Sequence, residues 1–457
     1  MKYIFTIIIF FSIYCANAQV TNNDSTICST FFKQALNDDW AIAQLEYLVK
    51  NYPERLCGTK NSIAALEWSD KVLKNIGADS IFRQELMVPC WKRGIKEKGK
   101  IISKISGTKN INVCALGNSI GTGPKGITAN VVEVKNFEEL KALGTEKVKG
   151  KIVFFNRAMD PSFYYTFQAY GGAANQRTRG ASEAAKYGAV AVVIRSLTLS
   201  TDTFPHTGVM RYDTTVAKIP AFSVCTSNAN ELSDWLKNDG QLSLYLESNC
   251  EMLPEQKSYN LVAELKGSDF PNEYITVGGH IDCWDNSDGA HDDGAGIIHS
   301  IEVLKLFKDL EIKPKHTIRI VMFMDEEMDQ RGAKKYAEIA GKNNEKHIAA
   351  IESDRGGATP VGFSMDVADS VYKKVISWSK YFNNYGIFQL IRGGSGVDIG
   401  PLKKFGVPLF AIMPDSQRYF DYHHSGNDSF KSVNKRELQL GSASIAFMAF
   451  MIDKYGL

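Results

Sequence analysis

The amino-acid sequence predicts an α/β protein whose mostly parallel sheet is interrupted by a β-rich insert. With 457 residues, 44% of them hydrophobic and 23% charged, the chain can form about two or three domains with large cores. Strand-like and helix-like segments alternate after Pro254, which is typical of a parallel sheet joined by crossover helices. Short β-rich segments dominate from about Cys114 to Glu251, so we expect a separate domain there.

The first eighteen residues have the order of a secretory signal peptide. Lys2 precedes an apolar run from Tyr3 to Tyr14, and the small residues Ala16 and Ala18 follow. The run is shorter than the roughly 20 residues of a membrane-spanning helix. We therefore expect cleavage after Ala18 and an exported chain, secreted or periplasmic, without a membrane span. Lipid anchoring at Cys15 is the alternative, and the bulky Tyr14 before it disfavours that modification.

The expected elements follow from hydrophobic spacing and from the turn residues between them. Before and within the β-rich stretch we expect helices 30–52 and 61–76 and strands 81–88, 127–134, 151–155, 189–194, 219–224 and 242–246. After Pro254 we expect strands 274–278, 317–324, 348–351, 388–391 and 407–413 and helices 293–310, 330–340 and 434–455. The predicted division is a signal peptide 1–18, a first α/β part 19–112, an insert 113–255 and a second α/β part 256–457.

Charge and cysteine content exclude several classes of protein. The 53 basic and 51 acidic residues give a formal net charge of +2, so no global field attracts nucleic acid, and we expect no such partner. The cysteines after residue 18 include no CxxC pair, which argues against a thiolate zinc site. The disulfide pattern and the oligomeric state stay open, with a homodimer among the alternatives.

Side chains that bind metals follow successive predicted strands, where the carboxyl ends of parallel strands meet at one edge of the sheet. Each has an ordinary explanation on its own; Asp293, for example, is well placed to cap a helix. Together, two histidines and several acids at one edge predict a metal site. The histidines are His280 and one of the pair His423 and His424, and the acids are Asp282, Asp292, Asp293, Asp325, Glu326, Glu327 and Asp354.

This set exceeds what one tetrahedral zinc ion can use, because a catalytic zinc takes three protein ligands and a water. Two ions about 3.5–4 Å apart, with a shared water, account for it. We assign His280 and Asp354 to one ion, Glu327 and His424 to the other, and Asp292 to both. Glu326 then remains as the candidate general base. Asp282 is expected to accept the other ring N–H of His280 and so fix its tautomer. The donor types suit Zn²⁺, with Co²⁺ or Mn²⁺ as substitutes.

The segments that carry these residues resemble the co-catalytic di-zinc exopeptidases, a family that includes bacterial leucyl aminopeptidases and glutamate carboxypeptidases. The matching segments are 279–285, 289–294, 326–327, 352–354 and 423–425, with 55–61 and 91–94 near the N-terminus. The resemblance implies a phosphorylase/hydrolase-like three-layer catalytic domain interrupted by a protease-associated insert. It also implies a cis peptide bond between Asp292 and Asp293, and His424 rather than His423 as the ligand. The chain departs from the family pattern at Cys283, Asp325 and Arg355, which affects the expected substrate more than the expected catalysis.

The leading hypothesis is an exported zinc-dependent exopeptidase that hydrolyses dipeptides or short peptides with free termini, using a water that bridges the metals. The alternatives are an aminopeptidase acting on longer peptides, a single-zinc glutaminyl cyclase of the same fold, and a non-catalytic binding protein. The complete set of ligands and base argues against the last two. Candidate substrate residues are Arg355, Arg392 and Arg418 for a carboxylate, and Tyr419, Tyr422 and His423 for the oxyanion.

Overall fold

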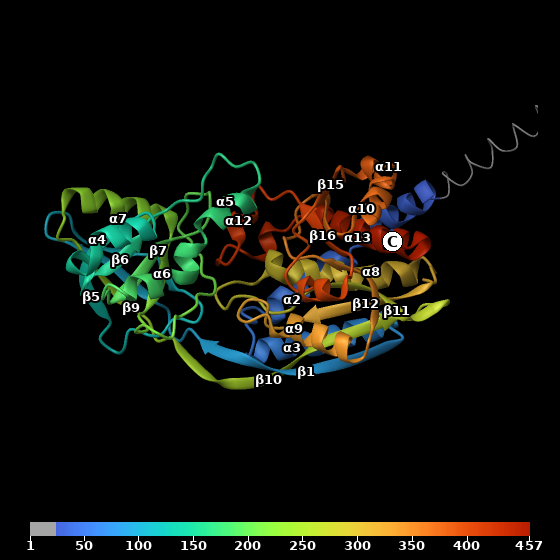
Figure 1. Ribbon diagram of the computed structural model, residues 1–457, viewed down its shortest axis with the longest axis horizontal. Coiled ribbons are helices and arrows are strands. Elements are labelled where there is room, and N and C mark those ends of the chain that lie inside the picture. Colours follow the sequence, from blue (N-terminus) through green and yellow to red (C-terminus); the bar gives the residue numbers. More distant parts are fainter. Residues whose placement is uncertain (1–23) are drawn as a thin grey trace, which may run out of the picture.

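The computed structural model describes residues 24–457, so the predicted signal peptide and Cys15 lie outside the described residues. Within this range the chain forms two eight-stranded mixed sheets that lie side by side (Figure 1). The first sheet consists of β1 (Ser80–Lys92), β10 (Glu251–Leu265), β11 (Phe270–His280), β12 (His316–Phe323), β13 (Lys346–Glu352), β14 (Pro360–Asp366), β15 (Gln389–Arg392) and β16 (Leu409–Pro414).

The first sheet has the strand order β1-β10-β12-β11-β13-β16-β14-β15 and is parallel mainly at its centre. β12, β11, β13 and β16 are parallel neighbours. β1 with β10, β10 with β12, and β14 with β16 are antiparallel. The sheet is therefore mixed, and the prediction of a mostly parallel sheet is confirmed in part, since four of its seven neighbouring pairs are parallel. Helical crossovers join β11 to β12 and, at the edge of the sheet, β14 to β15, whereas β1 and β10 flank the insert and pair antiparallel.

Helices cover both faces of this sheet and give three layers. Residues of β12 alternate between the faces: Ile320 and Met322 join the main core, and Val321 and Phe323 join a smaller core with Tyr336. The main core is shared with α2 (Trp40–Asn51), α3 (Lys60–Ile76), α8 (Ala295–Asp309) and α13 (Lys435–Tyr455), and the smaller core with α9 (Arg331–Lys342).

The single helix predicted over residues 30–52 is two helices. Residues 24–37 are helical, and α2 begins at Trp40 after a break. The Asp38 carboxylate accepts the Trp40 N–H at 2.9 Å, a local hydrogen bond that competes with a continuous helix. By contrast α3 begins one residue before its predicted start and ends as predicted, because the Thr59 side chain caps its start and Gly77 takes a left-handed φ of 87° at its end.

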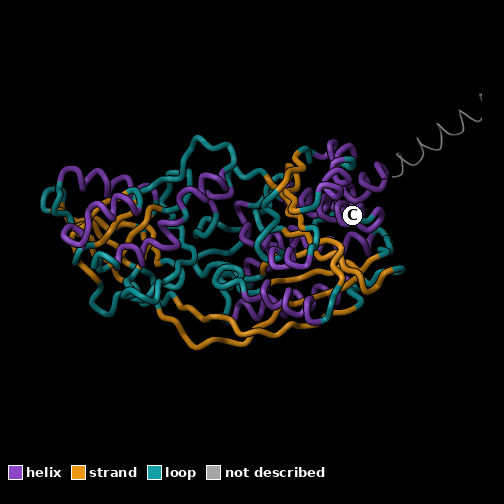
Figure 2. Tube along the Cα trace, in the orientation of Figure 1, coloured by secondary structure: helices purple, strands orange, loops and turns teal. Residues whose placement is uncertain are grey.

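β1 and β10 form a long antiparallel pair along the lower edge of the molecule (Figure 2). The sequence predicts only residues 81–88 of β1 and none of β10. Pro254, which reads as a break, lies inside β10 where the register shifts opposite Val88 and Cys90. Such a bulge tolerates a proline, because no ladder N–H is required there. This pair links the two sheets.

The second sheet has the order β3-β2-β9-β5-β6-β7-β8-β4 and its own core. The five strands predicted in this stretch are present, but residues 137–238 also hold four helices, so the insert is α/β rather than mostly β. β2 and β3 precede residue 113, the predicted start of the insert. The elements are β2 (Lys98–Ser103), β3 (Gly107–Ile111), β4 (Val113–Ala115), β5 (Ile127–Val134), β6 (Ile152–Phe155), β7 (Ala191–Arg195), β8 (Ala221–Val224), β9 (Ser243–Glu247), α4 (Phe137–Val148), α5 (Thr166–Ala173), α6 (Asn175–Ala185) and α7 (Thr226–Asn238).

Two further properties concern the described part of the chain. Among residues 24–457, no helix combines the length and apolar character needed to cross a bilayer. All seven cysteines in this range are free. Cys283, one of the departures from the family pattern, is fully buried, and burial raises the pKa of its thiol to about 11, so it is not a reactive group at neutral pH.

We predict that Glu302 on α8 makes stability depend on pH. The side chain is fully buried, and burial raises the pKa of its carboxyl to about 8, against about 4.3 in an unfolded chain. The folded state therefore keeps a proton that the unfolded state releases, and stability falls as the pH rises from about 4.3 to about 8. The side chain of Glu302→Gln cannot ionise. The melting temperature of this variant relative to that of wild type should therefore increase as the pH rises from about 4.3 to about 8. Glu46→Gln on the surface is the matched control, and a constant difference at every pH would contradict the assignment.

Candidate active site

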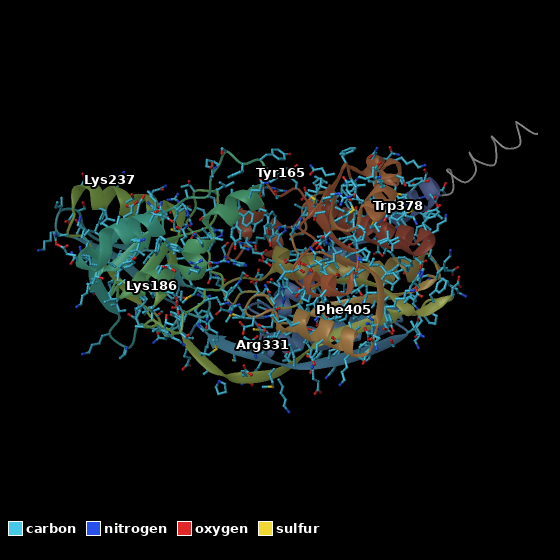
Figure 3. All side chains as sticks on the ribbon, viewed as in Figure 1. Tyr165, Lys186, Lys237, Arg331, Trp378 and Phe405 are labelled. Carbon is cyan, nitrogen blue, oxygen red and sulfur yellow. The ribbon has the colours of Figure 1, made fainter. Side chains whose placement is uncertain are left out.

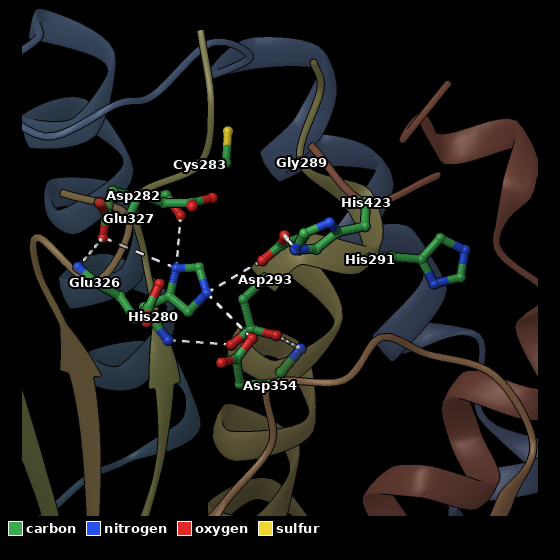
Figure 4. Close-up of polar contacts among 12 residues, drawn as sticks. His280, Asp282, Cys283, Gly289, His291, Asp293, Glu326, Glu327, Asp354 and His423 are labelled. Carbon is green, nitrogen blue, oxygen red and sulfur yellow. Dashed lines mark hydrogen bonds and ion pairs between the residues drawn. The ribbon is translucent and has the colours of Figure 1, made fainter. Parts of the chain in front are cut away.

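His280 is the last residue of β11 and lies at the centre of the predicted site (Figure 4). Its Nδ1 lies 2.9 Å from the backbone carbonyl oxygen of Asp282. Because a carbonyl only accepts, Nδ1 carries a hydrogen. Burial acts to lower the pKa of this ring, but Asp354 and Asp292 beside Nε2 raise it well above its usual value. Nε2 lies 3.2 Å from Asp354 Oδ1 and 3.3 Å from Asp292 Oδ1. One imidazole and two carboxylates thus converge on one point.

Asp292 lies between this group and a second one. While its Oδ1 faces His280, its Oδ2 lies 3.4 Å from His424 Nε2. His424 Nε2 also lies 3.2 Å from Glu327 Oε2. The peptide bond between Asp292 and Asp293 is cis, as the resemblance implies. One carboxylate therefore connects the two groups of potential ligands that the sequence assigns to two ions.

His423 lies beside His424, and the two rings stack with centroids 3.5 Å apart. His423 Nε2 is 3.8 Å from Asp292 Oδ2, farther than His424 Nε2. The carbonyl oxygens of both histidines accept hydrogen bonds from the insert: His206 donates to His423 and the Thr207 N–H to His424, at 2.7 and 2.8 Å. The insert therefore fixes the loop that presents these imidazoles.

Asp282 acts differently from the expectation. Its backbone carbonyl, and not its carboxylate, takes the His280 ring N–H; the carboxylate Oδ1 is 3.9 Å from Nδ1. Oδ1 instead accepts the backbone N–H groups of Asp325 and Glu326, at 2.9 and 3.2 Å. Asp282 thus positions the segment that carries Glu326, whose half-buried side chain has no ion pair or hydrogen bond with the other site residues.

The electrostatics of the site favour bound cations. Burial, with repulsion from Asp292 and other neighbouring carboxylates, raises the pKa of Glu327 well above its usual value, and burial also raises that of Asp354. Glu327 Oε1 and Asp292 Oδ2 are buried without a hydrogen-bond partner in the described residues. Burial, together with the nearby His423 and Arg177, lowers the pKa of His424 well below 6.5, so this imidazole is neutral and can donate a lone pair. The donor set fits divalent metal ions.

The predicted substrate residues separate into two groups. Arg392 pairs with Asp369 at 2.6 Å and Arg418 with Glu437 at 3.3 Å, both on exposed surface outside the metal-ligand cluster. Arg355 directly follows Asp354 and lines a cavity. Tyr422 stacks on His291, with centroids 5.0 Å apart, and Tyr419 lies 5.3 Å from the His423 ring. Of the three arginines, only Arg355 stays a candidate for binding substrate.

Sequence reasoning missed the residues that support the ligands from a distance. Asp428 accepts the N–H groups of Ala290, His291 and Asp292 at 3.1, 2.7 and 3.1 Å. Arg55 donates to the carbonyls of residues 281, 288 and 289 at 2.7–2.8 Å. Arg177 of α6 places Nη1 3.4 Å from His424 Nδ1. The only signal for Arg55 and Asp428 was their place in or beside family-like segments; nothing in the sequence pointed to Arg177.

Comparison with known proteins agrees with this geometry. The profile of peptidase family M28 matches residues 260–448. Carboxypeptidase Q of Bos taurus is 32% identical over 431 residues, which cover 94% of this chain and 88% of that protein. The crystal structure of a peptidase M28 precursor from Shewanella amazonensis has a TM-score of 0.90 and 32% identity, covering 94% of this chain and 97% of that chain. A zinc aminopeptidase from Bacillus subtilis shares the fold, with a TM-score of 0.63, 18% identity and coverage of 89% and 93%.

The resemblance to exopeptidases of the aminopeptidase and glutamate carboxypeptidase type, and within them to carboxypeptidase Q, is therefore confirmed. The likeness to carboxypeptidase Q extends over nearly the whole described chain and includes both the insert and the site. The chain belongs to peptidase family M28 and is a metallo-exopeptidase.

Proposed function

We propose that the protein is an exported zinc-dependent exopeptidase that hydrolyses dipeptides or short peptides with free termini. The observation that carries this proposal is the Asp292 carboxylate, which faces His280 on one side and His424 on the other. Carboxypeptidase Q and a zinc aminopeptidase among the similar proteins support it. Export rests on the apolar N-terminal segment. The proposed organisation is a protease-associated domain over 113–255, to whose sheet β2 and β3 are added, inside a catalytic domain of 19–112 and 256–457.

His280 and Asp354 would hold one Zn²⁺, Glu327 and His424 the other, and Asp292 would bridge both, with Co²⁺ or Mn²⁺ as substitutes. When bound, the two ions would supply the Lewis acid that polarises the scissile carbonyl and lowers the pKa of the water between them. The protein holds these ligands in place through Asp428 and Arg55. Each ion would then have three protein ligands, which leaves room for water and substrate.

Glu326 would move the proton. Burial raises the pKa of this carboxyl to about 8, with neighbouring acids adding to the effect, so Glu326 binds a proton readily. It would take a proton from the attacking water as the C–O bond forms and give it to the amine nitrogen as the C–N bond breaks. Asp282 keeps Glu326 in place by accepting its backbone N–H.

Replacing Glu326 with glutamine tests the assignment of the base. Glu326→Gln should lower kcat for free dipeptides roughly 10²–10⁴-fold, the usual contribution of a general base, because glutamine cannot accept the proton. The zinc content should stay at about two per chain, since Glu326 is not a ligand in this scheme. Both quantities are measured on the same sample, by amino-acid release and by elemental analysis.

The matched control is Glu338→Gln, an exposed glutamate on α9 that pairs with Lys335. Normal hydrolysis by Glu326→Gln, or loss of zinc in this variant, would contradict the role of Glu326. If longer or C-terminally blocked peptides are cleaved as fast as dipeptides, the protein is an aminopeptidase and not a dipeptidase.

We also predict that Asp428 controls metal affinity without binding metal. Asp428→Ala removes the acceptor of three N–H groups, including that of the bridging Asp292, and should weaken zinc binding roughly 10–100-fold, as is usual for residues that support ligands. Competition with a chelator measures this, and circular dichroism checks that the fold is kept. Asp234→Ala on the exposed face of α7 is the control. Unchanged zinc affinity in folded Asp428→Ala would reject the role.

A further inference from the structure

A cavity of about 390 Å³ lies next to the metal-ligand cluster and takes its walls from both parts of the chain. Its size is within the range of small-molecule pockets. Arg355, one residue after Asp354, lines it together with the ends of β14, β15 and β16. Residues 164, 165, 167 and 168, before and in α5 of the insert, close the opposite side.

The insert side of this cavity is aromatic and exposed. Tyr164 is 70% exposed, Tyr165 40% and Phe167 36%. Figure 3 labels Tyr165 at the top of the molecule, near the junction of the two parts. Clusters of exposed aromatic side chains at a pocket mark binding surfaces more often than isolated ones do. Val361, Ile391 and Met413 add aliphatic surface from the catalytic side.

Arg355 is the cation of this cavity, and it has no carboxylate partner within 4 Å in residues 24–457. Its guanidinium donates to the Gly394 carbonyl and lies 5.5 Å from the Phe167 ring centroid. By comparison Arg93 and Arg319 each pair with two carboxylates, at 2.6–2.9 Å. A half-buried guanidinium with free donors, in a cavity with apolar walls, is suited to a carboxylate that the substrate brings.

We propose that this cavity binds the C-terminal residue of the substrate, with Arg355 holding the free α-carboxylate and Tyr164, Tyr165 and Phe167 covering an apolar side chain. This inference rests on the proposed function and narrows it to dipeptides that end in a large apolar residue. An acidic side chain is the other source of a carboxylate. Asp415 lies in the wall with an exposed side chain and would repel a second negative charge, so the α-carboxylate is favoured.

The test compares free and amidated ligands. An uncleavable alanyl-leucine analogue, in which a methylene group replaces the peptide carbonyl, and its C-terminal amide are titrated calorimetrically into zinc-loaded protein. Arg355→Gln should weaken binding of the free acid roughly 10–100-fold, the usual range for a charge-assisted contact, and that of the amide less than about 2-fold. Arg392→Gln is the control, because Arg392 lies on β15 outside the cavity walls and pairs with Asp369.

Equal effects of Arg355→Gln on acid and amide, or no effect on either, would overturn the subsite. If Arg355→Gln weakens binding of an alanyl-glutamate amide analogue and does not weaken binding of the free acid, Arg355 holds a side-chain carboxylate, and the proposal is wrong. Failure of the proposed function looks different. Wild type would then hydrolyse no peptide, while the Arg355-dependent preference for the free acid in binding would remain.

The aromatic wall is tested independently of the charge. Tyr164→Ser removes the most exposed ring and should lower the preference for alanyl-leucine over alanyl-alanine, in kcat/KM, roughly 3–10-fold, with little change for alanyl-alanine. Ile105→Ser, at a 70% exposed apolar residue between β2 and β3, should leave the ratio unchanged. An unchanged ratio in Tyr164→Ser would show that the side chain of the C-terminal residue is not covered by this wall.

Discussion

The arrangement of the site depends on one buried carboxylate, that of Asp292, which faces an imidazole on each side. A buried carboxylate is costly without compensating positive charge, and here Glu327 and Asp354 increase the negative charge further. His424 is neutral and does not compensate for it, and His280 does so only while it is protonated on both ring nitrogens, a state in which it cannot bind a metal. Divalent cations between the proposed ligands would resolve this conflict, and binding of metal would then be coupled to folding of this region.

The loop that carries Asp292 needs partners for its backbone as well as for its side chain. Asp428 accepts three N–H groups of this loop, and Arg55 donates to three carbonyls in and near it. Because the loop is buried, unpaired groups there would destabilise the fold. Arg55, from the N-terminal part of the described chain, and Asp428, from its C-terminal part, thus hold the strand-end loops in place. The N- and C-terminal parts therefore meet at the active site.

The sequence identifies the proposed ligands better than it identifies the residues that support them. His280, Asp354 and Glu327 follow hydrophobic strands, and the edge at which parallel strands end brings them together whatever the exact register. The Asp428 and Arg177 contacts depend on loop geometry and on the placement of α6, which no local pattern encodes. β10 was missed for a related reason: Pro254 breaks a local pattern, yet a bulge opposite β1 accommodates it. The helices of the insert were underestimated because they are short, with 8 to 13 residues each.

The insert is part of the site, although its own sheet lies outside the catalytic sheet. His206 and Thr207 hold the backbone of the two active-site histidines, and Arg177 lies against the ring of His424. Gly208 permits this approach, because a Cβ there would lie 2.4 Å from the Arg177 guanidinium. The stack of Phe167 on Tyr419 then joins the aromatic wall of the cavity to the same loop, with centroids 5.3 Å apart. The part of the chain that would surround the substrate is therefore also the part that positions His424, so substrate selection and metal geometry would not vary independently.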